Sequence, residues 1–193
     1  RLLEERLIEE REVKDVAFGR PQQCLSVKEG HAWSVNIMLR RGSFQGTLND
    51  YHTLKAPLAS HSFNLPELLT PDALVQFIAG GLQALCQQAA LKVGQIQVVS
   101  VALQGGIEHT TGVVRYCPLF TDYNINLMVL LEQRLGIPVR IYNIAHCTNY
   151  LLAKRSPGAS YVAFMLGSGI LGYGYFTHGF SVLGENGFYP EIV

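Results

Sequence analysis

The sequence carries no excess charge of either sign. Its 193 residues include 15 Lys and Arg and 15 Asp and Glu, so the formal net charge is zero. Binding of nucleic-acid phosphates needs clustered surplus cations, and this balance argues against such a groove within the chain itself. Apolar residues make up 48% of the chain and charged residues 16%, which is enough apolar material for a sizeable core. The length suits one large domain or two small ones.

Long apolar runs and paired cysteines are also missing. No run of about 18 apolar residues occurs, so no membrane-spanning segment is expected. The first residues are charged and do not resemble a signal peptide. The four cysteines are Cys24, Cys86, Cys117 and Cys147, and none forms a CxxC pair of the kind found in zinc knuckles or redox motifs. They are expected to be thiols of a reduced, cytoplasmic protein.

Acidic residues are scarce after residue 100. Phosphoryl transfer needs one carboxylate to hold Mg²⁺ and another to accept the hydroxyl proton. Of the five acids in this part of the chain, only Glu191 follows a turn that could frame a polar ligand. The histidines show neither HxH nor i,i+4 spacing, so no metal site is indicated. A Cys-His dyad of His146 and Cys147 is not expected either, because adjacent helical residues point about 100° apart.

The first 24 residues are predicted to be the end of one module. Residues 1–14 combine many charges with Leu3 and Leu7, a pattern that favours an amphipathic helix. Gly19-Arg20-Pro21 then predicts a turn. A chain that opens inside a helix without an initiating methionine is expected to be a fragment.

The remaining sequence predicts alternating strands and helices. Thr70 as N-cap with Pro71 at the first helical position marks a helix start, and residues 96–103 form a continuous apolar run typical of a buried parallel strand. This order favours an α/β domain with a mixed sheet. The predicted strands are 31–39, 43–50, about 52–60, 96–103, 139–142 and 160–166; the predicted helices start at Thr70 and span 124–135 and 144–154.

A glycine-rich turn is predicted at 167–174, directly after the last of these strands. Gly167-Ser168-Gly169 could present backbone N–H groups and one hydroxyl to a phosphate. A plain β-hairpin turn explains the same residues and is the more frequent outcome for a lone glycine pattern.

Several segments together resemble the ROK family (repressors, open reading frames and kinases), also called NagC/XylR. Gly112–Pro118 and Asn126–Val139 resemble the family's central strand–helix–strand, and 166–174 (LGSGILGYG) its second phosphate motif. Residues 184–192 (GENGFYPEI) resemble its sugar-binding segment. Residues 7–10 (LIEE) and 19–21 (GRP) resemble the last helix and the wing of the winged helix-turn-helix found in ROK repressors.

The departures from the family bear on catalysis. ROK sugar kinases open with a DxGGTK-type phosphate loop, where this sequence has Met38-Leu39-Arg40-Arg41. The family's catalytic base is the Asp of an END motif, where this sequence has Tyr142-Asn143-Ile144. Ile144 cannot accept a proton, so the resemblance implies a chain without kinase activity.

The resemblance implies an actin-like ATPase (ribonuclease H-like) fold preceded by a winged-helix remnant. The implied boundaries are 1–24 for the end of the winged helix-turn-helix, 25–143 for the first lobe and 144–193 for the start of the second. The implied function is a sugar-responsive transcriptional regulator, a repressor by expectation, in which this chain forms the non-catalytic sensing and oligomerisation part. A ROK kinase that phosphorylates a hexose with ATP is the alternative, and a pure oligomerisation domain without ligand is a third possibility.

The resemblance also implies ligand and partner sites. A degenerate sugar pocket would use Asn143 and Glu191, with Gly105 and Gly106 as its backbone wall; the other possibility is that Asn143 caps the following helix and Glu191 is solvated. Gly167, Ser168 and Gly169 would be a vestigial phosphate loop. Arg20 would contact the DNA backbone beside an operator-binding helix-turn-helix upstream. The expected partners are that operator, a sugar or sugar phosphate effector, and further copies in a homodimer or homotetramer. No cofactor is expected in this chain, whereas zinc is possible in a longer protein, because the family's zinc ligands lie beyond Val193.

Overall fold

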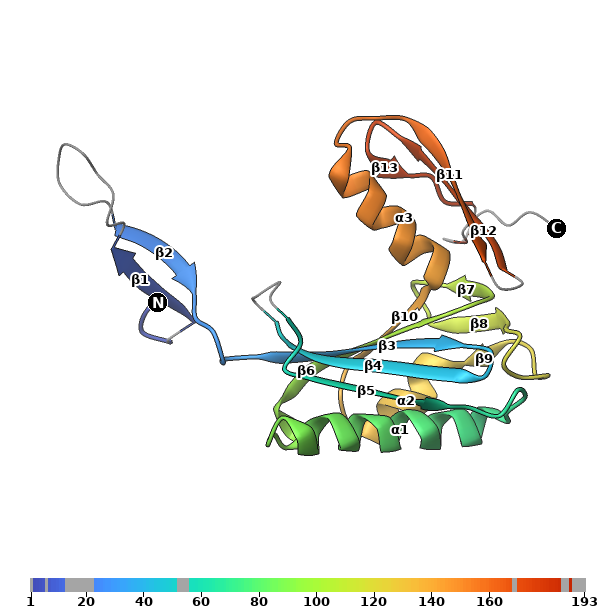
Figure 1. Cartoon of the computed structure of the whole chain (residues 1–193), viewed down its shortest axis with the longest axis horizontal. Helices are drawn as coiled ribbons and strands as arrows, with labels where there is room; N and C mark the ends of the chain where they lie inside the picture. Colours follow the sequence, from blue (N-terminus) through green and yellow to red (C-terminus); the bar gives the residue numbers. More distant parts are fainter. Residues whose placement is uncertain are drawn as a thin grey trace.

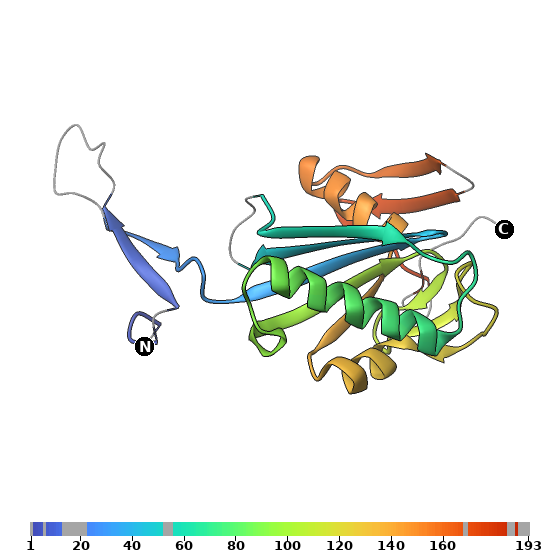
Figure 2. The same cartoon turned by 60° about the horizontal axis from the view of Figure 1, so that its bottom comes forward.

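The computed structural model (Figures 1 and 2) describes residues 2–5, 7–12, 23–51, 56–167, 170–184 and 188. Within this part of the chain, no helix is long and apolar enough to cross a membrane. The elements in chain order are β1 (Ile8–Glu12), β2 (Gln23–Val27), β3 (Trp33–Arg40), β4 (Ser43–Asp50), β5 (Ala59–Asn64), α1 (Pro71–Gln88), the 3₁₀ helix η1 (Val93–Gln95), β6 (Ile96–Leu103), β7 (Gly106–Glu108), β8 (Val113–Tyr116), β9 (Ile125–Asn126), α2 (Leu127–Leu135), β10 (Val139–Asn143), α3 (Ile144–Arg155), β11 (Tyr161–Gly167), β12 (Ile170–Thr177) and β13 (Phe180–Ser181).

A five-stranded sheet of order β10-β6-β3-β4-β5 forms the centre of the molecule. β10, β6 and β3 run parallel, whereas β3, β4 and β5 are joined as antiparallel neighbours. The predicted mixed α/β sheet is therefore confirmed. Figure 1 shows α1 and α2 on one side of this sheet, and α3 with the β11–β13 sheet on the other.

The core lies between the sheet and the two helices α1 and α2. On β3, Val35, Ile37 and Leu39 alternate with more exposed residues and are almost fully buried, because successive side chains of a strand point to opposite faces. Each such side chain contributes about 1.5–3 kcal/mol on burial. α1 begins as predicted, with the Thr70 hydroxyl accepting a hydrogen bond from the Ala73 N–H at 3.2 Å.

One glycine in α1 permits a close approach of helix to sheet. A Cβ at Gly81 would lie 2.3 Å from the buried ring of Phe44 on β4. Gly46, also on β4, is packed less tightly, with the Leu85 side chain 2.9 Å from its ideal Cβ position. These two positions allow the large Phe44 ring to fill the space between β4 and α1.

The described N-terminal residues, 2–5 and 7–12, do not form the predicted helix. Ile8–Glu12 is strand β1, which pairs antiparallel with β2 over the register Ile8↔Val27 to Glu12↔Gln23. The prediction was wrong because the charge and leucine pattern is local, whereas the strand is defined by a partner more than ten residues away. The predicted boundary after residue 24 falls within β2. In Figure 1 this two-stranded unit lies apart from the central sheet.

Two other predicted elements also shift. β5 is Ala59–Asn64 instead of about 52–60, and residues 52–55 lie outside the described part. The predicted helix 124–135 starts only at Leu127, because Ile125–Asn126 pairs with β8 as β9.

The glycine-rich turn is narrower than predicted. β11 ends at Gly167 and β12 begins at Ile170, so residues 170–174 are strand. Gly172 packs against the Ala145 side chain and Gly174 against the Asn149 amide. These two glycines therefore let β12 approach α3 closely.

Candidate functional site

Asn143 joins two elements at the end of the sheet. It is the last residue of β10 and the N-cap of α3. Its side-chain oxygen accepts hydrogen bonds from the N–H groups of Ala145 at 2.7 Å and His146 at 3.4 Å. Its amide nitrogen donates to the carbonyl oxygen of Gly105 at 2.8 Å. The predicted alternative, a helix-capping Asn143, is therefore present, and one of its two amide N–H groups remains for a further acceptor.

Gly105, in the turn from β6 to β7, and Gly106, the first residue of β7, lie near Asn143. Gly105 has φ of +123°, a conformation that L side chains rarely adopt, and a Cβ there would lie 2.0 Å from the carbonyl oxygen of Tyr116. A Cβ at Gly106 would lie 2.7 Å from the Tyr116 ring. The structure thus brings together three of the four residues predicted for a sugar pocket. Glu191, the fourth, lies outside the described residues.

Two histidines meet next to this turn. The rings of His109, which follows β7, and His146, in the first turn of α3, have centroids 5.0 Å apart. The rings of Tyr142 and Tyr150 both stack on that of His146, with centroid distances of 6.2 and 6.3 Å. The His109 Nδ1 lies 3.4 Å from the carbonyl oxygen of Ile141.

Burial keeps both imidazoles neutral at pH 7. Burial, together with a smaller effect of the neighbouring His109, lowers the pKa of His146 to about 4. Burial also lowers the pKa of His109, against a smaller opposing effect of the Ile141 carbonyl. This cluster was missed from the sequence, because 37 residues separate the two histidines and no short spacing relates them.

A groove of about 850 Å³ lies between α3 and the face of the sheet opposite to α1. Amide, hydroxyl, aromatic and aliphatic side chains line it, and this set contains no Asp, Glu, Lys or Arg. Its lining residues are Asn36, Ile37, Met38, Gln45, Thr47, Ser100, Ala102, Tyr142, His146, Cys147, Tyr150 and Leu151. These described side chains can donate and accept hydrogen bonds and stack on a ligand, but none of them is a carboxylate that could hold Mg²⁺ or accept a proton.

The residues that depart from the kinase pattern have structural roles in the sheet, a turn and the start of α3. Met38 faces the groove, whereas Leu39 is fully buried in the core. Arg41, in the turn between β3 and β4, forms an exposed ion pair with Glu67 at 3.0 Å. Ile144 is 3% exposed at the start of α3. None of these side chains therefore supplies a group for phosphoryl transfer.

The other predicted site residues are only partly described. Gly167 ends β11, while Ser168 and Gly169 of the predicted phosphate loop, and Arg20 of the predicted DNA contact, lie outside the described residues. Across the described ranges, no group of three or more His, Cys, Asp and Glu could hold a metal ion. Burial raises the pKa of the Cys147 thiol, which disfavours a thiolate nucleophile in the groove.

Comparisons with known proteins relate the chain to one family. The model of the ROK family matches residues 55–192. A glucokinase of Thermotoga maritima is 28% identical over 152 residues, which are 72% of this chain and 46% of that protein. The chain thus spans about half the length of this relative.

Solved structures share the fold. The crystal structure of a ROK family transcriptional regulator, a homologue of the Escherichia coli MLC protein, matches with a TM-score of 0.74 and 20% identity, over 97% of this chain and 47% of that one. An inorganic polyphosphate/ATP-glucomannokinase from Arthrobacter sp. strain KM matches with a TM-score of 0.65 and 23% identity, over 78% of this chain and 60% of that one. The likeness establishes the predicted actin-like ATPase (ribonuclease H-like) fold.

Proposed function

Because the chain belongs to the ROK family, we propose that it is the effector-sensing part of a sugar-responsive transcriptional regulator, a repressor, and not a sugar kinase. The observation that carries this proposal is the chemistry of Met38 and Ile144, which stand where the family's kinases have acids. A thioether and an alkyl group neither hold Mg²⁺ nor accept a proton. Loss of a general base alone typically lowers a rate by about 10² to 10⁴.

The N-terminal strand pair supports the regulator. The regulator structure matches 97% of the chain, which must include β1 and β2, whereas the glucomannokinase matches 78%. In the proposed protein, β1 and β2 are the strands of the wing, and Arg20 between them contacts the DNA backbone. A helix-turn-helix preceding residue 1 would then place its recognition helix in the major groove of the operator.

The groove supports a neutral sugar as the effector. Amides and hydroxyls suit a polyol, and the aromatic rings can pack on its C–H faces. A sugar phosphate would call for Lys or Arg, and the described residues of the lining include neither. Asn143, Gly105 and Gly106 are not among the described residues that line the groove. By the resemblance, the remaining N–H of Asn143 and the carboxylate of Glu191 would bind further hydroxyls beside the two glycines. Gly167, Ser168 and Gly169 would be the remnant of a phosphate loop.

Calorimetric titration of the chain with neutral hexoses and hexose phosphates tests this function. We expect a neutral hexose to bind without sugar-dependent ADP formation from ATP. Asn36→Ala, an exposed strand residue that lines the groove, should weaken binding, whereas the matched Asn64→Ala on β5 should leave it unchanged. Sugar-dependent ATP turnover would favour the kinase instead. Failure of every sugar to bind would favour a pure oligomerisation domain.

A further inference from the structure

The outer edge of β5 is open. β5 is the last strand in the order of the central sheet, and within the described ranges no strand pairs with its outer side. An exposed edge presents free N–H and C=O groups to any other strand, and proteins usually protect such edges with charged residues or proline. The six residues of β5, ASHSFN, include neither. This edge therefore lacks the usual protection against pairing.

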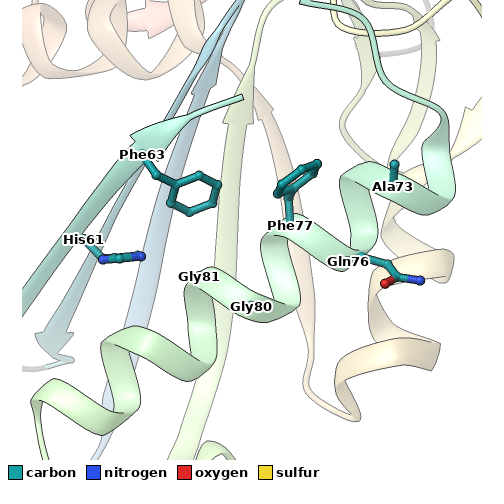
Figure 3. A pocket seen from close by; sticks show the side chains of 7 residues that line it. All are labelled: His61, Phe63, Ala73, Gln76, Phe77, Gly80 and Gly81. Atoms are coloured by element: carbon teal, nitrogen blue, oxygen red, sulfur yellow. The ribbon is translucent and has the colours of Figure 1, made fainter. Parts of the chain in front are cut away.

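A pocket of about 660 Å³ adjoins this edge. Figure 3 shows the rings of His61 and Phe63 reaching from β5 toward α1, and the ring of Phe77 on α1 opposite them. Gly80 is exposed in the middle of the helix, and a Cβ there would meet nothing within 4 Å. A glycine in a helix interior costs about 1 kcal/mol relative to alanine. No contact within the described structure requires Gly80, but its missing side chain keeps the pocket open.

The hydrogen bonds between β5 and β4 determine which backbone groups of β5 remain available to another strand. The Leu65 N–H donates to the Gly42 carbonyl at 2.9 Å, which continues the register Ser43↔Asn64. Because bonded and non-bonded positions alternate in an antiparallel ladder, the odd-numbered residues of β5 bond to β4. The backbone groups of Ser60, Ser62 and Asn64 therefore face the open edge.

We propose that two copies of this chain pair antiparallel through β5, about a twofold axis at Ser62. This register sets Ser62 opposite Ser62 and Ser60 opposite Asn64 of the second copy, and it uses every outward-facing group in about six hydrogen bonds. On the α1 side, His61 of one copy lies opposite Phe63 of the other. These rings extend over the pocket beside β5, where a cross-strand aromatic pair is favourable.

The chemistry of the patch fits a second copy. A twofold contact brings each surface against itself, so any net charge near the axis would meet its own sign. The six residues of β5 and the pocket-lining residues of α1 include no Asp, Glu, Lys or Arg. The patch therefore joins to itself without repulsion, and its hydrogen-bonding residues pair only with one another.

Substitutions of opposite charge at Ser62 test the proposed twofold axis. Sedimentation velocity should show a dimer for the wild-type chain and monomers for Ser62→Glu and Ser62→Lys, because like charges then lie directly opposite. An equimolar mixture of the two variants should regain the dimer. Gln45→Glu and Gln45→Lys are matched controls, since Gln45 is exposed and pairs with Ser62 from β4, one strand away from the axis. These controls should remain dimeric.

A cysteine at the axis gives a second measurement. Directly opposed bonded residues have Cα atoms about 5.5 Å apart, within reach of a disulfide. In a Cys24→Ser background, which removes the exposed thiol, Ser62→Cys should form a covalent dimer on mild oxidation, and Gln45→Cys should not. A wild-type chain that is monomeric at about 100 µM would overturn the proposal. The proposal would also be overturned if this monomer bound extended peptides of other proteins along β5. A dimer that tolerates both charges and does not cross-link would place the interface elsewhere.

Discussion

Replacement of Asn143 by alanine should destabilise the protein through two separable effects. The first is loss of the N-cap of α3, which typically costs about 1 kcal/mol. The second is the Gly105 carbonyl, which loses its amide donor; leaving a buried acceptor unpaired costs about 1–3 kcal/mol. Because this bond is only part-buried, we take the lower half of that range. The expected loss in free energy of unfolding is then about 2–3 kcal/mol.

Asn143→Ser separates the two effects. The serine hydroxyl can still accept from the first N–H groups of α3, but it is too short to reach Gly105. We expect a loss of about 1–2 kcal/mol, smaller than that of the alanine variant by about 1 kcal/mol. Urea unfolding, with a slope common to all three proteins, measures both differences. Equal losses for serine and alanine would refute the capping contribution, and a serine variant as stable as wild type would refute the contribution of the Gly105 bond.

Three further predictions concern glycines and a histidine. Gly105→Ala should lower the free energy of unfolding by more than about 3 kcal/mol, because it combines a strained φ with a methyl group 2.0 Å from a carbonyl oxygen. Gly136→Ala, at φ +66° in open space, should lower it by only about 1 kcal/mol. Urea unfolding measures both losses, and similar values would contradict the steric argument. Gly80→Ala should raise stability by up to about 1 kcal/mol and Gly81→Ala should lower it by about 1–3 kcal/mol in thermal unfolding, and the opposite order would contradict the packing of α1. The pKa of His146 is about 4 in the folded chain and near its ordinary 6.5 when unfolded, so the unfolded state binds the extra proton and stability should fall as pH drops from about 6.5 toward 4. Urea unfolding at several pH values should show a shallower decline for His146→Asn, and an unchanged decline would refute this role.

The central sheet and its helices could be predicted because their signals are local. Thr70 and Pro71 mark the start of α1 through capping and a fixed φ, and 96–103 is mostly apolar because it is an inner strand of the sheet. Residues 8–12 carried a misleading local pattern, since their strand exists through pairing with β2. The β12 glycines suggested a wide turn, whereas Gly174 serves close packing against Asn149.

The candidate site was only partly visible for the same reason. Helix capping by Asn143 could be read from its place between an apolar strand and a helix. Its bond to Gly105 spans 38 residues and exists only because β6 and β10 lie side by side in parallel. The pairing of His109 with His146 follows from the same adjacency. Contacts of this kind depend on strand order, which a single sequence does not specify.

Asn143 and Ile144, two consecutive residues at the end of β10, have different structural roles, and these roles determine which substitutions the site can accept. Asn143 holds α3 and the β6–β7 turn together with bonds that need no ligand, so the local structure persists whether or not chemistry occurs there. Ile144 contributes its side chain to a site that is 97% shielded from solvent. An ionised aspartate introduced there would need new polar partners before it could be tolerated. A carboxylate at this position would thus require coordinated substitutions in the residues that pack around Ile144.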